Sequence, residues 1–246
     1  MALEGKKILI VGASSDLAVS INEILYNSNN IIGFHYNTND KSLSKYDEGE
    51  RVKKFQKNID SSLTCFQLID DFVNWAGGID CLIQLSGGIK KPANWEDLTE
   101  EEWSYDLSVN MIMPFFLAQR AVSHMKNSGG RIVMTSTVSA AHGGGSTSLA
   151  YGVAKAGVEC IVKGLARDCA KYNILVNAIA PGFFLTKFHT EKMKRNHDQL
   201  QERIKLIPLK RAGTTEELAG TVMYLLSESA SYITGQVIAI SGGDWL

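Results

Sequence analysis

A tyrosine and a lysine four residues apart are the side chains in this sequence best suited to proton-transfer chemistry. Tyr151 and Lys155 lie in a segment rich in alanine and other small residues, 149–165, which predicts a helix. At this spacing the phenol and the ammonium project from the same helical face. A nearby ammonium favours the phenolate, so we expect the pKa of Tyr151 to fall below its usual value of about 10. A tyrosine tuned in this way exchanges a proton with an alcohol or a carbonyl. A solvated helical face that carries both side chains is the alternative.

The surrounding sequence alternates apolar runs with helical patterns, which is typical of βαβ units in a parallel sheet. We expect strands at 8–11, 31–36, 52–56, 81–85, 131–135, 174–180 and 237–240. Helices are expected near 17–25, 62–75, 149–165 and 215–227, and a long one after 100 with a kink at Pro114. These patterns predict an α/β fold with a doubly wound parallel sheet of about seven strands and helices on both faces. The economical prediction is a single domain over residues 1–246.

The segment 183–211 departs from this alternation because it is long, polar and only weakly periodic. We interpret it as a mobile substrate lid over a site. Between Lys187 and Arg211 it carries eight basic and three acidic residues, which favours an anionic substrate. A solvated helical face is the alternative explanation of these charges.

Composition excludes several classes of partner. The 246 residues carry a formal net charge of −1, so no nucleic acid or anionic membrane surface is expected as a partner. The four cysteines form no C-x-x-C pair and are expected to be free thiols in a reducing compartment. The apolar run after Lys6 and Lys7 is too short for a membrane span. We therefore predict a cytoplasmic protein without a targeting segment, and we predict no metal site.

The first predicted strand runs directly into a glycine-containing turn. Such a turn, placed between a strand and a helix, brings backbone N–H groups and the positive helix end near a pyrophosphate. Gly12 and Leu17 flank the turn, and Ser14 and Ser15 add hydroxyl donors. Asp16 is unfavourable beside a phosphate, and we expect it to cap the helix that follows. An ordinary βα turn that binds no nucleotide is the alternative.

With this turn and the tyrosine–lysine pair in view, the chain resembles the short-chain dehydrogenase/reductase family, in its single-domain branch. The resemblance runs from Lys6 to Gly243 and is closest in layout to 3-ketoacyl carrier-protein reductases. It implies a Rossmann-like fold that binds NAD(P) across the carboxyl ends of the strands. The chain departs from the family's T-G-x-x-x-G-x-G turn at three positions, which hold Val11, Asp16 and Ala18.

The resemblance also implies which other residues bind the cofactor. Asn58 and Ile59 match the pair that holds the adenine, and Thr186 matches the threonine that holds the nicotinamide carboxamide. Ser86 and Gly87 end a segment in which the family has N-N-A-G; here it begins with Gln84 and Leu85, so we expect the side chains that brace the sheet to be lost. Pro181 and Gly182 complete the family's N-x-x-x-P-G motif.

The same resemblance assigns catalytic roles. Tyr151 exchanges the proton with the substrate, and Lys155 stabilises the phenolate and grips the nicotinamide ribose. Asn110 holds a water that relays protons from the lysine to solvent. The family's catalytic serine falls on Thr137, whose hydroxyl still donates to a carbonyl oxygen. Ser136 and Ser139 are the fallback positions.

The choice between NAD and NADP depends on the end of the second predicted strand. An acid there favours NAD through the ribose hydroxyls, but this chain has Asn37 in that region and its first acid at Asp40. This pattern leans slightly toward NADP(H) over NAD(H). No arginine is placed for a 2′-phosphate, and His35 and Lys41 are the nearest candidates.

We therefore predict an oxidoreductase that transfers a hydride between nicotinamide and a carbonyl or secondary alcohol. The alternative is a catalytically silent nucleotide-binding sensor or scaffold on the same fold, because fold alone does not establish turnover. Family members are usually homotetramers or homodimers that pair through the two long helices beginning near Glu100 and Leu149.

Overall fold

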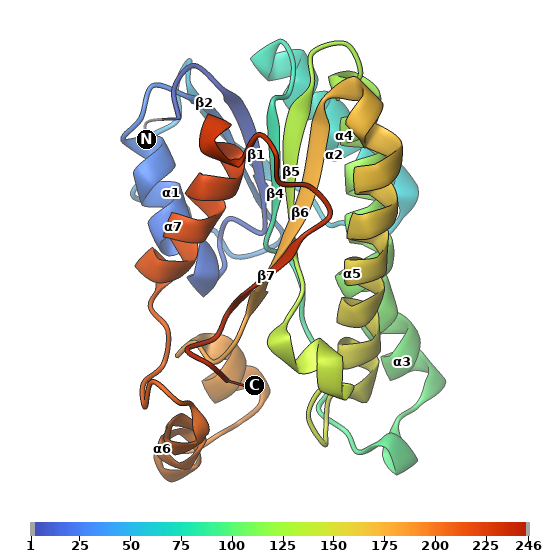
Figure 1. The fold of residues 1–246 in the computed structure, drawn as a ribbon, viewed down its shortest axis with the longest axis vertical. Coiled ribbons are helices and arrows are strands. Elements are labelled where there is room, and N and C mark those ends of the chain that lie inside the picture. The colour runs from blue at the N-terminus through green and yellow to red at the C-terminus, as the bar shows by residue number, and fades with distance from the viewer. Residues whose placement is uncertain (1–2, 245–246) are drawn as a thin grey trace.

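The computed structural model describes residues 3–244, and its centre is a parallel sheet in the order β3-β2-β1-β4-β5-β6-β7 (Figure 1). The strands are β1 (Lys7–Val11), β2 (Ile31–Tyr36), β3 (Val52–Gln56), β4 (Cys81–Gln84), β5 (Gly130–Thr135), β6 (Ile174–Pro181) and β7 (Val237–Ile240). Every predicted strand is present, and each end lies within one residue of its predicted position. The strand order reverses between β1 and β4, and ligands of such sheets bind outside the carboxyl ends at this switch point.

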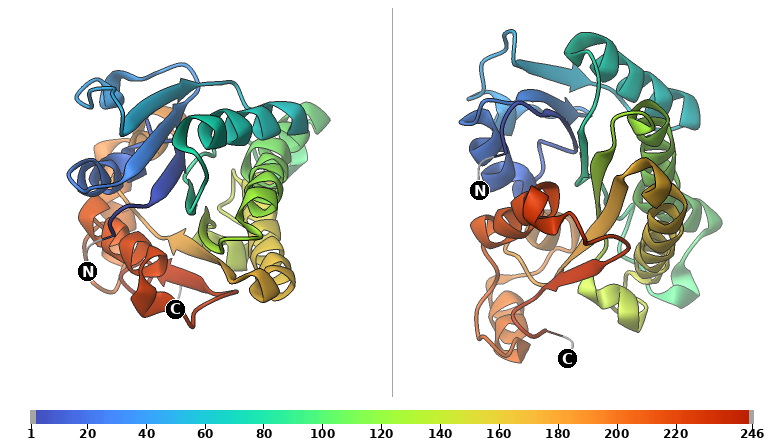
Figure 2. Two further views of the ribbon diagram at one scale, coloured as in Figure 1. Left: turned by 90° about the horizontal axis from the view of Figure 1, so that it is seen from above. Right: turned by 45° about the horizontal axis from the view of Figure 1, so that its top comes forward.

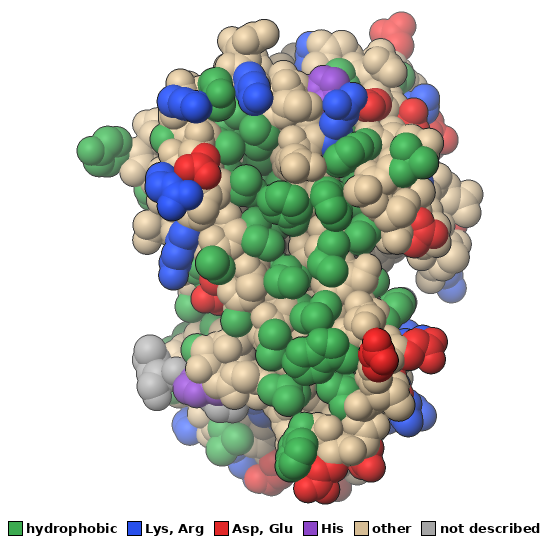
Figure 3. Space-filling view, turned by 90° about the vertical axis from the view of Figure 1, so that its right-hand side faces the viewer, with side chains coloured by type: hydrophobic (Ala, Val, Ile, Leu, Met, Phe, Trp, Pro, Cys, Tyr) green, Lys and Arg blue, Asp and Glu red, His purple; other side chains and the backbone are tan. Residues whose placement is uncertain are grey.

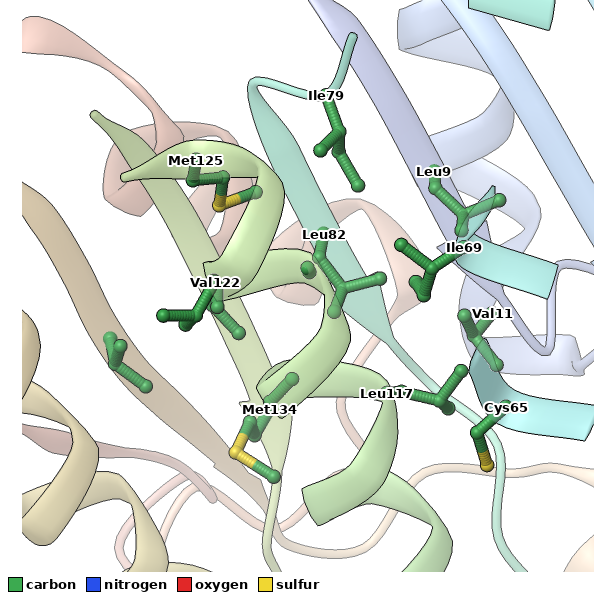
Figure 4. Close-up of a cluster of buried hydrophobic side chains, with 14 of the residues drawn as sticks. Leu9, Val11, Cys65, Ile69, Ile79, Leu82, Leu117, Val122, Met125 and Met134 are labelled. Atoms are coloured by element: carbon green, nitrogen blue, oxygen red, sulfur yellow. The ribbon is translucent and has the colours of Figure 1, made fainter. Parts of the chain in front are cut away.

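Helices cover both faces of the sheet, which confirms the doubly wound α/β fold (Figures 1 and 2). One face carries α1 (Val19–Tyr26) and α7 (Thr215–Leu226); the other carries α2 (Ser62–Ala76), α4 (Met113–Met125) and α5 (Leu149–Cys169). Strand β1 shows why both faces are apolar. Its side chains alternate, so Ile8 and Ile10 pack with α1 and α7 while Leu9 and Val11 pack with α2 and α4 (Figure 4).

The long helix predicted after residue 100 is interrupted rather than simply kinked. It consists of α3 (Glu100–Leu107), a π-helical turn at Ser108–Ile112, and α4. Pro114 follows the turn and has no N–H, so it cannot bond to the carbonyl of Asn110 as a regular helix requires. The irregularity therefore precedes the proline and places Asn110 in the middle of the turn.

The segment 183–211 contains structure that its weak periodicity does not predict. It forms a π-helical turn at Phe188–Lys192 and the helix α6 (His197–Leu206). Asn196 begins α6 with a capping box, and a small cluster of Phe183, Leu200 and Ile207 buries its inner face. Figure 1 shows α6 beyond the carboxyl ends of the strands, near the C-terminus.

Candidate active site

A cavity of about 480 Å³ lies at the carboxyl ends of the strands and gathers most of the predicted site residues. The predicted residues that line it are Ser14, Ser15, Asp16, Leu17, Ser86, Gly87, Thr137, Tyr151, Lys155, Pro181, Gly182 and Thr186. They come from the segments that follow β1, β4, β5 and β6, and from helix α5. The other predicted residues, Gly12, Asn37, Asn58, Ile59 and Asn110, do not line the cavity.

Gly12 lies beneath the cavity and brings two turns into contact. Its backbone has φ +80°, and a Cβ there would lie 2.6 Å from the backbone nitrogen of Ser86. The backbone N–H of Gly12 donates to Nδ1 of His35 at 3.2 Å, and Nε2 of His35 lies 2.9 Å from the carbonyl oxygen of Lys57. Burial lowers the pKa of His35 to about 4. His35 therefore braces the turn as a neutral imidazole, and its candidacy as a 2′-phosphate ligand is wrong.

The predicted adenine-side residues lie outside the cavity. Asn37 and Asn58 are exposed, and the amide of Asn58 donates to Oδ2 of Asp60 at 2.9 Å. Ile59 is half-buried and packs against the core beneath α2. This end of the predicted nucleotide site is an open surface. In the loop that follows β2, only Asn39 lines the cavity.

Asp16 connects the glycine-containing turn to the segment 183–211. Its Oδ2 accepts a hydrogen bond from the backbone N–H of Lys187 at 2.6 Å. No side-chain cap is formed at the start of the helical turn that begins at Asp16, so the predicted capping role is wrong. The carboxylate instead holds the segment 183–211 against the glycine-containing turn, a contact between residues 171 positions apart.

Asn110 clamps the segment that follows β4. Its Oδ1 accepts from the Gly88 N–H at 3.0 Å, and its Nδ2 donates to the Gly88 carbonyl at 2.6 Å and to the Asp106 carbonyl at 2.8 Å. A Cβ on Gly87 would lie 2.7 Å from Oδ1 of Asn110 and 3.4 Å from Nζ of Lys155. Residue 87 must therefore be glycine for the clamp and the lysine to approach together.

Gln84 supplies a brace of its own at the end of β4. It is buried, and its Nε2 donates to the carbonyl of Pro114 at 3.0 Å. Its backbone carbonyl accepts from the hydroxyl of Thr135 at 2.7 Å. These bonds join β4 to α4 and to β5, so the expectation that this departure removes the brace is wrong.

Tyr151 and Lys155 lie at the start of α5 and face the same cavity. Nζ of Lys155 lies 5.7 Å from the centre of the Tyr151 ring and donates to the carbonyl of Thr135 at 2.8 Å. Burial lowers the pKa of Lys155 to about 8, while burial and the charge of Asp106 raise the pKa of Tyr151 to about 12. The expected fall in the phenol pKa is therefore not found, because the ammonium bonds to a backbone carbonyl and desolvation of the phenolate dominates.

The three hydroxyls at the end of β5 differ in what they can reach. Ser136 is buried, and its hydroxyl donates to Oε1 of Glu159 at 2.7 Å and also lies 3.2 Å from the carbonyl oxygen of Lys155. Thr137 is half-buried; its hydroxyl lies 3.2 Å from that of Ser139 and 3.3 Å from the carbonyl oxygen of Pro181. Ser136 is thus committed to bracing α5, whereas Thr137 and Ser139 hold their hydroxyls at the cavity wall.

Several cavity residues were not predicted from the sequence. They come from the segment 183–211 and from the end of β7, and include His189, Arg195, Arg203 and Asp244. The excess of basic residues in the segment was the one available signal, but it did not distinguish lining residues from exposed ones.

An open, doubly wound sheet with a cavity at its switch point is the architecture of dinucleotide-dependent enzymes. A family model described as enoyl-(acyl carrier protein) reductase matches residues 12–244. The chain belongs to the short-chain dehydrogenase/reductase family and is an NAD(P)-dependent oxidoreductase.

Individual relatives extend over the whole chain. The chain is 34% identical to nodulation protein G of Rhizobium meliloti (strain 1021), across 98% of this chain and 97% of the relative. It is 35% identical to a 3-oxoacyl-[acyl-carrier-protein] reductase of Thermotoga maritima, across 99% of both chains. Among solved structures, levodione reductase superposes with a TM-score of 0.89 at 25% identity, covering 98% of both chains. The layout predicted from the motifs, that of 3-ketoacyl carrier-protein reductases, is confirmed.

Proposed function

We propose that this chain reduces a carbonyl to a secondary alcohol, or performs the reverse reaction, with Tyr151 as the general acid and base. The observation that carries the proposal is a phenol, an ammonium and a hydroxyl at one cavity wall, supplied by Tyr151, Lys155 and Thr137. When bound, NAD(P) supplies or accepts the hydride. Thr137 donates a hydrogen bond to the substrate oxygen and holds it at the phenol.

The proton moves between the phenol of Tyr151 and the substrate oxygen. A pKa of about 12 keeps the phenol protonated near pH 7, which suits a proton donor in the reductive direction. Once the proton has left, the Lys155 ammonium, whose Nζ lies 5.7 Å from the centre of the Tyr151 ring, stabilises the phenolate in a low-dielectric site. Asn110 fixes the backbone beside Lys155, and its carbonyl, which Pro114 cannot engage, is the acceptor that we assign to the proton-relay water.

The residues at the turn fit a dinucleotide. Gly12 removes the Cβ that would block Ser86, and this close approach leaves room above the turn for a pyrophosphate. We assign the phosphates to Ser14, Ser15, Asp16 and Leu17. We assign the adenine end to Asn37, Asn58 and Ile59. We assign the nicotinamide and its ribose to Ser86, Gly87, Pro181, Gly182, Thr186 and Lys155.

NADP(H) is our preferred cofactor because no carboxylate from the end of β2 faces the cavity. With His35 buried, Lys41 is the cation that we assign to the 2′-phosphate. The preference over NAD(H) is small, since both Lys41 and Asn37 are exposed and lie on an open surface.

We also propose a homodimer or homotetramer formed through α3, α4 and α5. Figure 3 shows apolar side chains gathered on the face that these helices form. Tyr105, Ile112, Leu149 and Val153 are large apolar residues with between 36% and 44% of their surface exposed there.

Over residues 3–244, every helix is too short or too polar to traverse a bilayer.

The proposal is tested by nicotinamide fluorescence and absorbance with the wild type and with Tyr151→Phe. NADPH and NADH are titrated first, and a panel of ketones and 3-ketoacyl thioesters is added to the better binder. We expect cofactor binding in both proteins and substrate-dependent oxidation in the wild type only. Turnover in Tyr151→Phe close to that of the wild type would refute the role of the phenol. Binding without oxidation on any carbonyl would favour a sensor.

A further inference from the structure

One guanidinium in the cavity wall has no anionic partner within residues 3–244. Arg195 is half-buried and lines the cavity, and no carboxylate of the described chain lies within ion-pair distance of it. Its neighbour Arg203 differs, because it pairs with the buried carboxylate of Asp244. Burial and the charge of Arg203 lower the pKa of Arg195.

An aromatic series connects this guanidinium to the phenol. The ring of Phe188 lies 5.9 Å from the ring of Tyr151, and the ring of His189 lies 5.4 Å from that of Phe188. The His189 ring also lies 4.6 Å from Phe183, and its carbonyl accepts from the backbone N–H of Arg195 at 3.0 Å. Arg195 is thus connected through His189 and Phe188 to the ring of Tyr151.

His189 adds an unsatisfied polar group to this part of the cavity wall. Its Nδ1 is buried and has no hydrogen-bond partner among the described residues. Burial, Arg195 and Arg203 lower its pKa to about 4, so the ring is neutral near pH 7 and offers one N–H and one lone pair. A buried polar nitrogen without a partner costs free energy, which a ligand oxygen at this point would recover.

The charges that line the cavity leave a positive excess at this end. Of the acids, Asp16 accepts from the Lys187 N–H and Asp244 pairs with Arg203. Glu191 is exposed, and it faces the cavity together with Lys187, Lys192 and Arg195. An anionic group on the substrate would compensate Arg195.

We propose that Arg195, together with His189, forms a subsite for an anionic group, a carboxylate or a phosphate, carried by the carbonyl substrate. This inference rests on the proposed function and names the substrate class. The fork of a guanidinium matches both groups with two parallel hydrogen bonds, and partial burial strengthens them. The subsite orients the substrate so that its carbonyl meets Tyr151 while its charged end points toward α6.

Paired substrates test the subsite. Reduction of 3-oxobutanoate is compared with that of its neutral ethyl ester, and dihydroxyacetone phosphate with dihydroxyacetone. We expect Arg195→Gln to raise KM for the preferred anionic substrate about 10- to 100-fold while leaving kcat and the KM of the neutral partner little changed. Arg195→Lys should restore part of the affinity, and the pair that responds identifies carboxylate or phosphate. Lys205→Gln is the matched control, because Lys205 is an exposed lysine of α6 that pairs with Glu202 outside the cavity.

Two outcomes overturn the subsite. In one, Arg195→Gln affects charged and neutral substrates equally; in the other, it weakens cofactor binding instead, which would assign the guanidinium to the cofactor phosphates. Calorimetric titration of the anionic probes into the protein saturated with oxidised cofactor measures the subsite without turnover. Binding that is lost in Arg195→Gln supports it, and absence of binding in the wild type refutes it. Failure of the proposed function is seen separately, as absence of NAD(P)H oxidation with every ketone.

Discussion

Replacement of Lys155 by methionine is expected to abolish turnover and yet to stabilise the fold near pH 7. Lys155 is 3% exposed, and burial lowers its pKa from 10.5 to about 8. This lowering of the pKa corresponds to a free-energy cost of about 3 kcal/mol for burying the ammonium in the folded state. Methionine has a similar length and no charge, so it removes this cost. It also removes the hydrogen bond from the charged Nζ to the Thr135 carbonyl, worth about 1.5 kcal/mol, which leaves a net gain of about 1.5 kcal/mol.

The sign of the pH dependence follows from proton binding. Between about pH 8 and pH 10.5 the unfolded chain holds a proton on Lys155 that the folded chain has released, so wild-type stability rises with pH in this window. Below about pH 8 both states are protonated and the cost is constant. The advantage of Lys155→Met should therefore be full at pH 7 and should vanish or reverse near pH 10.

Urea unfolding at pH 7 and pH 10 measures this difference. A gain of about 1.5 kcal/mol raises Tm by about 3–6 °C in a domain of this size, which a thermal scan also detects. Lys163→Met, at an exposed lysine of the same helix, is the matched control and should change stability little at either pH. A Lys155→Met variant that is less stable than the wild type at pH 7 would contradict the reasoning. So would a stability difference that does not change with pH.

Three further predictions concern residues of the site. Gly87→Ala is expected to cost about 1–3 kcal/mol of stability and most of the turnover, because its Cβ would meet Asn110 at 2.7 Å. Gly220→Ala, a helical glycine with nothing within 4 Å of its Cβ, should be neutral or stabilising in the same unfolding assay. Thr137→Ser should keep kcat within about tenfold, whereas Thr137→Ala should lower it by about 100-fold. Ser136→Ala should mainly lower Tm and change kcat little, since the Ser136 hydroxyl is bonded to Glu159. If Ser136→Ala lowers kcat more than Thr137→Ala does, the roles of the two hydroxyls are exchanged.

The sheet was predictable from the sequence because its strands are buried on both faces. The run 8–11, for example, is continuous and apolar, and Gly12 ends it sharply. The helix α6 was not predicted, since it buries few of its residues and the polar face dominates its sequence. Its start is nevertheless marked by a local signal, the capping pair Asn196 and Gln199.

Most of the candidate site was predictable as a set of residues, but its electrostatics were not. The sequence places Tyr151 and Lys155 on one helical face, yet the pKa of each depends on which groups exclude water and which carbonyl accepts from the ammonium. Asp16 and Gln84 show the same limit. Each departs from the family pattern in sequence, and each makes a contact with an element far along the chain, at Lys187 and at Pro114.

These contacts bear on whether the departures indicate a protein without turnover. Two departures from the family pattern favour a silent sensor, namely the altered turn and the threonine at the serine position. In the structure Asp16 joins the turn to the segment 183–211, and Thr137 keeps a hydroxyl at the cavity wall. Lys155 does not separate the two interpretations, because we also assign it to the nicotinamide ribose, and a protein that only binds nucleotides would use the buried ammonium there. The phenol of Tyr151 does separate them, because a buried lysine beside a phenol in a cavity is the arrangement that we expect for proton transfer.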